Sequence, residues 1–512
     1  MKKLIYVFTL CSFLVMSCSK DFLKVTPQSS VTSGDFYKTE DQFNQALIGS
    51  YAATRAVKWS VSAWVMGEMR SDNTHFEWGI QRGEEVDERE NIDYFMDDQT
   101  SAWAAEKYNN CYIGIAFTNN ILDNIDAADF SQASKDQIVG EAKFLRALFY
   151  FELVRFYGGV PLYTTAVKST EEAFITRSST DDTYAFILQD LTDAIAKLSV
   201  VSGFPQSGRA TQGAARMMLA DVYLTRKEWG LAEEQLKAIV QMSYSLLPDY
   251  ASVYDLENKN SSESVFEIQY QQGDKGQQNS IVYDFLPVSG DVSLITGTVP
   301  SRTILTIAQM NMPTREMIGT YEDGDKRLEA SIWIAEGSGP QGNMIIESVH
   351  SPIGYAWPAD KRSYAYIKKF LHAHTLEKNL DDNFPVYRYS ETLLALAEAL
   401  NEQGKSGEAL PFLNQVRVRA GLDPSTETDQ AILRDIISHE RRVELAFENK
   451  RWLDLVRTDK VIDVMVPNGA YLKTIFPIIP PAAYTGISHD RYIFPIPLRE
   501  IVIGKLEQNP GY

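Results

Sequence analysis

The sequence predicts a mainly α-helical protein built on tetratricopeptide-like helix pairs, with one large irregular insertion of loops and short strands. The helix-pair pattern occurs twice, at residues 213–241 and 387–421. Between them, residues 265–370 are rich in Gly, Pro, Ser, Thr and aromatic residues, with short strand-like pieces such as SVFEIQY and NMIIESV. Insertions of this kind usually gather on one face of a repeat scaffold and carry its binding surface.

The first residues have the three parts of an export signal, which we expect to span residues 1–17. Lys2 and Lys3 precede a mostly apolar run at residues 4–15, too short to span a bilayer, which needs about 20 residues. The run ends in Val-Met-Ser-Cys, which resembles a bacterial lipobox. We therefore expect acyl chains such as palmitate on Cys18, anchoring residues 18–512 to a membrane. The alternative is an ordinary signal peptide with a chance cysteine.

Helical periodicity covers about 35–260 and 380–465, and we expect residues 466–512 to form a C-terminal loop region of the same single domain. Two further helical hairpins are expected: residues 102–126 with 134–157, and 181–198 leading into the first repeat pair. In both repeat pairs small and large apolar residues recur at the same offsets, namely Leu219, Ala220, Tyr223, Ala232, Leu236 and Ile239, then Leu396, Ala397, Leu400, Ala409, Leu413 and Val416.

Charge and cysteine content exclude several classes of protein. The 49 basic and 68 acidic residues leave a net charge of −19, which argues against a nucleic-acid partner. Three cysteines cannot form a disulfide framework. We expect Cys111 to be a buried free thiol unless it pairs with Cys18. No apolar segment after Cys18 approaches transmembrane length.

Several motifs resemble the SusD/RagB-like outer-membrane lipoproteins. They are ERRVELAFENKRWLDLVRT at 440–458, the ending FPIPLREIVIGKLEQNPGY at 494–512, EAKFLRALFYFELVRFYGGVPL at 141–162, NQVRVRAGL at 414–422 and DKR at 325–327. One departure is Ile503-Gly504-Lys505, where the family commonly has Asn-Pro. The helical offsets and charges of 440–458 predict a scaffold held by ion pairs rather than a ligand site.

The resemblance implies a function without catalysis. Family members bind oligosaccharides at the cell surface and deliver them to a SusC-like TonB-dependent barrel transporter in the outer membrane. It implies no cofactor, no metal and no catalytic residue for this chain. Its location would be the outer membrane, lipid-anchored and facing the cell exterior.

A sugar site needs aromatic platforms and nearby hydrogen-bonding groups, and two zones offer both. The first zone contains Arg70, Asp72, Asn73, His75 and Trp78; the second, in the insertion, contains Tyr283, Phe285, Trp333, Tyr355, Trp357, Arg362 and Tyr364. From these we predict ligand contacts at Asp72, Asn73, Trp78, Tyr283, Trp333 and Trp357. The other tryptophans, Trp59, Trp64, Trp103, Trp229 and Trp452, are interpreted as packing residues.

Three alternatives stay open from the sequence. A surface glycoside hydrolase would need a carboxylate pair, but no motif singles one out. A peptidase would need a nucleophile elbow or metal motif, and only His372 and His374 resemble a ligand pair, at a spacing that does not favour metal. A tetratricopeptide-type adaptor or surface binder of peptides explains the repeats but not the aromatic-rich insertion.

Overall fold

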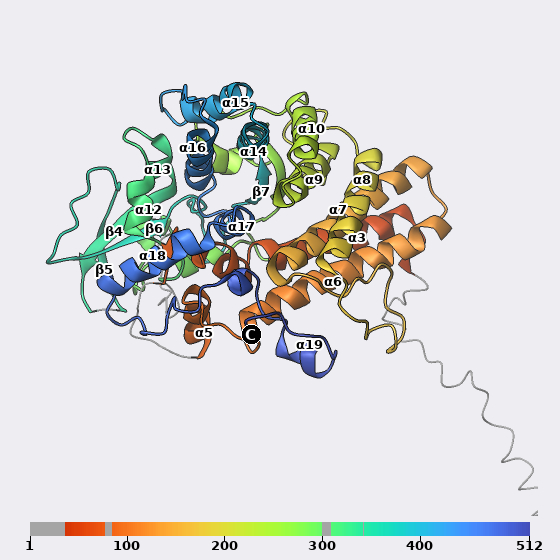
Figure 1. Cartoon of the computed structure of the whole chain (residues 1–512), viewed down its shortest axis with the longest axis horizontal. Helices are drawn as coiled ribbons and strands as arrows, with labels where there is room; N and C mark the ends of the chain where they lie inside the picture. The colour runs from red at the N-terminus through yellow and green to blue at the C-terminus, as the bar shows by residue number, and fades with distance from the viewer. Residues whose placement is uncertain (1–35, 77–83, 299–308, 341) are drawn as a thin grey trace, which may run out of the picture.

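The computed structural model describes residues 36–76, 84–298, 309–340 and 342–512, and all structural statements below concern those residues. Its helices form a curved scaffold, with strands β4, β5 and β6 together at one end (Figure 1). The predicted signal peptide, Cys18 and Trp78 lie outside the described residues. Within the described part, no helix combines the length and apolarity needed to cross a bilayer.

The N-terminal helices pack around a long central helix. They are α3 (Glu40–Lys58), α4 (Val61–Trp64), the short π-helix η1 (Val65–Met69), α5 (Glu84–Asp93), α6 (Ala102–Asn124) followed by η2 (Ile125–Ala127), and α7 (Gln132–Tyr157). The predicted hairpin of 102–126 with 134–157 is confirmed as α6 and α7. Helix α7 is buried along most of its C-terminal half and ends at Gly158, whose φ of +73° suits glycine.

The two predicted repeat pairs are present as helix pairs. The first is α9 (Gln212–Thr225) with α10 (Trp229–Val240), preceded by α8 (Thr180–Lys197); the second is α14 (Tyr389–Glu402) with α15 (Ser406–Arg419). The apolar and small residues expected at the helix contacts are buried, except for Tyr223, which is half-buried. Helices α10 and α14 pack against each other, so the two pairs form one continuous scaffold despite their separation in sequence.

The insertion contains two small sheets as well as short helices. Strand β2 (Ser264–Ile268) pairs antiparallel with β7 (Phe384–Arg388), which closes the insertion onto the scaffold. Strand β4 (Ile332–Ser338) is the centre of a sheet with β5 (Ile345–His350) and β6 (Arg362–Ile367). The remaining short elements are η3 (Ala251–Tyr254), η4 (Leu256–Asn258), η5 (Ile281–Phe285), α11 (Ser293–Thr296), β3 (Met312–Pro313), α12 (Arg315–Thr320) and α13 (Lys326–Ser331).

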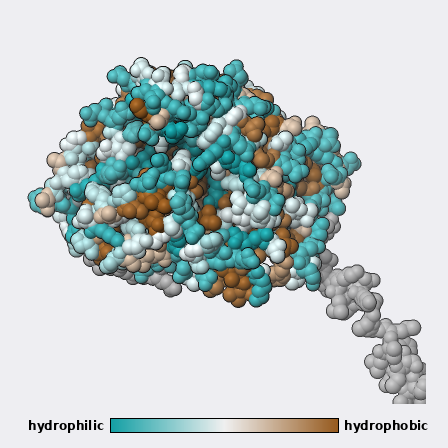
Figure 2. All heavy atoms as spheres, viewed as in Figure 1, coloured by the Kyte–Doolittle hydropathy of each residue, from teal (hydrophilic) through white to brown (hydrophobic). Residues whose placement is uncertain are grey.

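The C-terminal part is more helical than the sequence suggested. It contains α16 (Gln430–Glu444), α17 (Arg451–Arg457), α18 (Val461–Ile475), η6 (His489–Tyr492) and α19 (Leu498–Val502). Helix α18 thus runs into the segment expected to be loop. Pro467 and Gly469 are typical helix breakers, but the helix continues because Met465 and Leu472 are buried on one face. Exposed apolar residues of α18 include Val466 and Ile475. A brown patch lies near the centre of Figure 2, in the region where Figure 1 places this helix.

A buried network of ion pairs ties the insertion to the scaffold. Glu444, at the end of α16, accepts from Arg388 Nη1 at 2.9 Å and from Arg419 Nη2 at 2.5 Å, and its other oxygen lies 3.2 Å from Arg327 Nη1. Arg327 belongs to the DKR motif, and Glu444 to the 440–458 motif. The predicted structural role of the charges at 440–458 is confirmed at this position, because no ligand can reach these side chains.

Cys111 in α6 is a free thiol with no exposed surface, as predicted. Burial raises the pKa of the thiol to about 12, which keeps it protonated and unreactive in the folded protein. Of the tryptophans interpreted as packing residues, Trp59, Trp64 and Trp452 are fully buried. Trp103 is half-buried, and so is Trp229, which has a further role described below.

Candidate ligand-binding face

The structure brings the two predicted ligand zones side by side. Strand β1 (Thr74–His75), in the first zone, pairs antiparallel with β3 within the insertion that holds the second, with Thr74 opposite Pro313 and His75 opposite Met312. The pairing continues beyond the strands, since the backbone N–H of Thr314 donates to the carbonyl of Asn73 at 3.0 Å. Residues almost 240 positions apart therefore meet where the scaffold borders the insertion, at an edge formed by β1 and β3.

Asp72 and Asn73 lie at this edge, but their side chains are buried and bound within the protein. Asp72 forms a two-pronged ion pair with Arg451, at 2.8 and 3.0 Å, and a further contact with Arg442 at 2.9 Å. Burial works to raise the pKa of Asp72, but the two guanidinium groups outweigh it and lower the pKa. Asn73 donates to Glu68 at 2.8 Å and accepts from Arg442 at 2.9 Å. These residues hold the edge in shape rather than presenting free polar atoms.

Trp357 lies in a loop between β5 and β6 among aromatic and charged neighbours. Its ring meets that of Tyr355 edge to face, with centroids 5.2 Å apart, and the guanidinium of Arg315 lies 4.3 Å from its centroid. The Tyr355 hydroxyl donates to Glu336 at 2.8 Å and lies 2.7 Å from the Ser363 hydroxyl. We call this surface the Trp357 face; it consists of Arg315, Glu336, His350, Tyr355, Trp357, Lys361 and Ser363.

The Trp357 face combines partly exposed rings with charged side chains at its rim. Lys361 pairs with Glu336 at 2.9 Å and with Glu347 at 3.3 Å, and Lys361 itself is exposed. Because Trp357 and Tyr355 are only half-buried, their ring surfaces remain accessible next to hydroxyl, carboxylate and ammonium groups. This is the combination that a sugar ring requires: an apolar platform with hydrogen-bonding groups around it.

Trp333 and Tyr283 do not share this face. Trp333 is half-buried, donates through Nε1 to the carbonyl of Glu329 at 2.9 Å and lies under the ammonium of Lys368, 4.1 Å from its ring centroid. Side chains alternate along a strand, so Trp333 and Glu336 point to opposite faces of β4. Tyr283 is 1 % exposed, and its hydroxyl lies 2.6 Å from His374 Nε2.

Other residues of the two zones are also bound within the protein. Arg70 is fully buried between the rings of Phe95 and Phe494, at 4.1 and 4.4 Å, and pairs with Asp97 at 2.6 Å. Phe285 and Tyr364 are buried, His75 is 5 % exposed, and Arg362 donates to the carbonyl of Gly339 at 2.8 Å. His372 bonds to Asp382 while His374 bonds to Tyr283, so the two histidines serve different partners.

Comparison with known proteins decides the family. A model of the SusD family matches residues 262–512, and a model described as "Starch-binding associating with outer membrane" matches residues 21–224. The chain belongs to the SusD/RagB family. "SusD-like protein P38" of Formosa agariphila is 26 % identical over 98 % of this chain and 97 % of its own. "Starch-binding protein SusD" of Bacteroides thetaiotaomicron is 23 % identical over 85 % of this chain and 83 % of its own.

Solved structures of the SusD/RagB family confirm the predicted fold class. A "Laminarin binding SusD-like protein" superposes with a TM-score of 0.73 at 25 % identity, over 93 % of this chain and all of that one. "Surface glycan-binding protein A" from Bacteroides thetaiotaomicron, in complex with laminarihexaose, gives a TM-score of 0.72 at 21 % identity, covering 92 % and 99 % of the two chains. At that identity the second likeness concerns the fold alone.

In this member of the SusD/RagB family, the polar neighbours of Trp357 and Tyr355 were not predicted from the sequence. Arg315 opens α12, and a signal for that helix was present: Thr314 follows a proline and caps the helix by accepting from the N–H of Met317. Glu336 and Ser363 are opposite each other on β4 and β6, so their proximity follows from the strand register. No local pattern in the sequence could supply that register.

Proposed function

We propose that this protein is a non-catalytic lipoprotein of the outer membrane that captures oligosaccharides outside the cell and delivers them to a SusC-like TonB-dependent transporter. Membership of the SusD/RagB family supports the proposal, together with relatives whose names state starch and laminarin binding. The observation that carries it is the Trp357 face, because an accessible aromatic pair bordered by hydroxyl and charged groups matches the chemistry of a glycan.

Trp357 is the residue through which we expect the ligand to be held. Its ring would stack on the C–H face of a sugar, while Glu336, Ser363 and Lys361 lie close enough to Tyr355 to meet the hydroxyls around the ring. A ligand contact of Trp78 stays a prediction. A ligand contact of Trp333 would lie on the other side of the sheet formed by β4, β5 and β6. Such a contact would therefore need a longer ligand or a second point of binding.

Binding to a glycan panel tests this proposal. The panel for affinity electrophoresis and calorimetry comprises laminarin, starch and other plant, microbial and host glycans. Trp357→Ala is expected to weaken binding about tenfold or more, since a stacked aromatic contributes roughly 1–3 kcal/mol. Phe174→Ala is the matched control, because Phe174 is an exposed aromatic outside the Trp357 face. Trp333→Ala, measured alongside, tests whether that ring contributes.

Three results would count against the proposal. Equal binding by wild type and Trp357→Ala would remove this face from the site. Binding to peptides but to no glycan would favour a peptide or other nutrient as ligand. Release of sugar from any polysaccharide by the pure protein would favour a glycoside hydrolase.

The membrane anchor is tested separately, by fractionation of cells that express Cys18→Ala. We expect this variant to leave the membrane fraction, because its thiol can no longer receive acyl chains. Delivery to a transporter is tested by co-purification of a TonB-dependent barrel with the tagged wild-type protein. Retention of Cys18→Ala in the membrane would contradict lipidation at this residue.

A further inference from the structure

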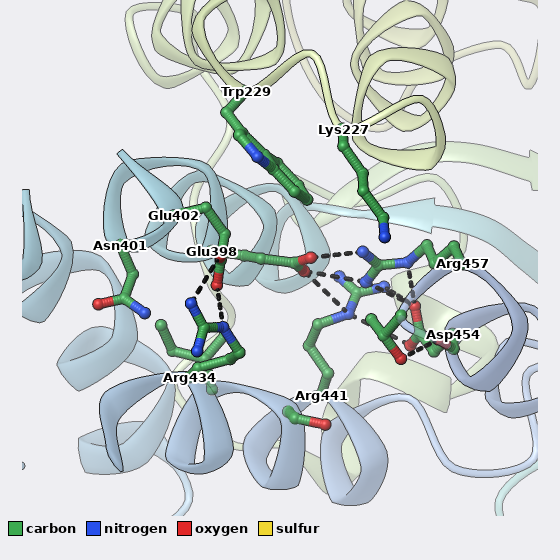
Figure 3. A pocket seen from close by; sticks show the side chains of 12 residues that line it. Lys227, Trp229, Glu398, Asn401, Glu402, Arg434, Arg441, Asp454 and Arg457 are labelled. Atoms are coloured by element: carbon green, nitrogen blue, oxygen red, sulfur yellow. Dashed lines mark hydrogen bonds and ion pairs between the residues drawn. The ribbon is translucent and has the colours of Figure 1, made fainter. Parts of the chain in front are cut away.

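A cavity of about 280 Å³ opens in the scaffold, between the two repeat pairs and the C-terminal helices. Its walls come from the turn before α10 and from α14, α16 and α17 (Figure 3). Its lining residues are Lys227, Trp229, Glu398, Asn401, Glu402, Arg434, Ile437, Ser438, Arg441, Asp454, Arg457 and Thr458. None of them belongs to the insertion, so this cavity is separate from the Trp357 face.

The floor of the cavity is built from ion pairs with well-defined geometry. Arg457 forms a two-pronged pair with Glu398 and also contacts Asp454 at 2.7 Å. Arg441 meets the same aspartate through Nε and Nη2, at 3.2 and 3.1 Å. These four side chains are held in place by one another and by neighbouring helices, so the floor is pre-organised for a ligand.

The cavity carries an excess of positive charge in a chain whose net charge is −19. Its lining has four cations (Lys227, Arg434, Arg441, Arg457) against three carboxylates (Glu398, Glu402, Asp454). No ion pair of Lys227 is found among the described residues, and its ammonium points toward the floor in Figure 3. The side chain of Arg441 is 6 % exposed, and its Nη1 has no hydrogen-bond partner. An anionic group entering the cavity would supply an acceptor to Lys227, and one that reached the buried Nη1 would supply an acceptor to Arg441 as well.

Trp229 forms the wall opposite this floor. Its side chain projects from the first residue of α10 toward Glu398 and Arg457 (Figure 3). Trp229 packs against the hydrophobic core, as interpreted from the sequence, but it is only half-buried and also lines the cavity. The carboxylates of Glu398 and Glu402 and the hydroxyl of Ser438 also line the cavity and offer acceptors for ligand hydroxyls.

We propose that this cavity binds a carboxylated sugar unit, such as a uronic acid residue of a glycan. The ring would stack on Trp229, the carboxylate would meet Lys227 and the free Nη1 of Arg441, and hydroxyls would donate to Glu398 and Glu402. An acidic peptide side chain is less well matched, because it has no hydroxyls for these acceptors and no ring to stack on Trp229. This second site does not depend on ligand binding at the Trp357 face.

The experiment uses ¹⁹F NMR of the protein labelled with 5-fluorotryptophan. The resonance of Trp229 is assigned from its loss in Trp229→Phe, and that of Trp357 from Trp357→Phe. The probes are sodium D-glucuronate, D-glucose and sodium N-acetylglutamate; the first two differ only at the carboxylate. We expect glucuronate to shift the Trp229 resonance saturably, with at least about tenfold higher affinity than either other probe.

Charge variants at Lys227 test the assigned contact without disturbing the core. Lys227→Gln is expected to weaken glucuronate binding about fivefold, and Lys227→Glu further, with both effects reduced in 1 M salt. The matched control is Lys505→Gln. Lys505 is also exposed, and its backbone is also in the left-handed region, with a φ of +58° against +60° for Lys227. Circular dichroism of each variant reports whether it is folded.

Three outcomes would overturn the proposal. A Trp229 resonance that glucuronate leaves unshifted, or a shift confined to Trp357, would remove the ligand from this cavity. Equal affinities for glucuronate and glucose would refute recognition of the carboxylate. Equal shifts with glucuronate and N-acetylglutamate would refute the sugar assignment in favour of an acidic peptide. Loss of neutral-glycan binding in Trp357→Ala bears on the proposed function alone.

Discussion

Replacing Glu444 by glutamine is expected to lower the free energy of unfolding by about 3–5 kcal/mol at pH 7. The change keeps the shape of the side chain and removes its negative charge. Glu444 lies among Arg327, Arg388 and Arg419, whose nitrogens are 3.2, 2.9 and 2.5 Å from its oxygens. The side chains of all four are between 0 and 4 % exposed, so water cannot replace the lost charge.

The expected loss of unfolding free energy in Glu444→Gln follows from the burial of the ion pairs rather than from their number. Removing one partner of a buried ion pair leaves an uncompensated charge in a medium of low polarity, which costs several kcal/mol. The amide of glutamine can accept from one guanidinium, but its NH₂ group would face another donor. Glu402→Gln is the matched control: its two-pronged pair with Arg434 has side chains 16 and 45 % exposed, and its loss should cost less than about 1 kcal/mol.

Urea unfolding followed by tryptophan fluorescence measures both variants. Burial alone would raise the pKa of Glu444, but Arg419, Arg388 and Arg327 hold the pKa well below its usual value of 4.5. The stabilisation by the wild-type carboxylate is therefore present above about pH 4.5 and is lost as the pH falls below it. The difference between wild type and Glu444→Gln should shrink in acid. Equal costs for Glu444→Gln and Glu402→Gln at pH 7 would refute the reasoning.

Three further predictions concern buried groups. Burial raises the pKa of Asp93 from 3.8 to about 8, so the free energy of unfolding of the wild type should fall as the pH rises between those values. Urea midpoints measured against pH test this expectation, and Asp93→Asn should make their dependence on pH weaker. Gly469→Ala should cost about 1–3 kcal/mol of unfolding free energy in the same assay, because the added Cβ would lie 2.3 Å from the ring of Tyr484. Cys111 should react with a thiol reagent only after unfolding, and rapid labelling of the native protein would contradict its burial.

The helical scaffold was predictable because its signals are local. Apolar residues at helical spacing fixed α6, α7, α9, α10, α14 and α15, and glycines such as Gly404, with φ +74°, marked their ends. The short helices α12 and α13 were missed, since six residues are too few for periodicity to show. The helical region was expected to end at about residue 465, but α18 continues through Pro467 to Ile475. The cost of the proline is offset by burial that only the tertiary structure provides.

The environment of the candidate ligand-binding residues was harder to predict, because it is set by distant partners. Asp72 and Asn73 stand in a polar, aperiodic segment, which is typical of an exposed loop. Their partners Arg442 and Arg451 follow 370 and 379 residues later along the chain. Residue type alone therefore suggested that the polar side chains of Asp72 and Asn73 are free, whereas in the fold they are paired. The partial exposure of Trp357 was easier to predict, because a Gly- and Pro-rich loop gives a tryptophan few neighbours to bury it. Its contact with a ligand stays a prediction.

The motifs that identify the SusD/RagB family mostly build the scaffold. Arg442 shows that one of them also supports the Trp357 face. It belongs to the 440–458 motif, and it pairs with Asp72 at 2.9 Å and with Glu316 at 2.7 Å. Glu316 neighbours Arg315, whose guanidinium covers one side of Trp357. A residue of the family motif thus fixes the start of α12. The motifs of the family thus account for the position of α12, whereas the ligand of the proposed Trp357 face is left to the glycan panel.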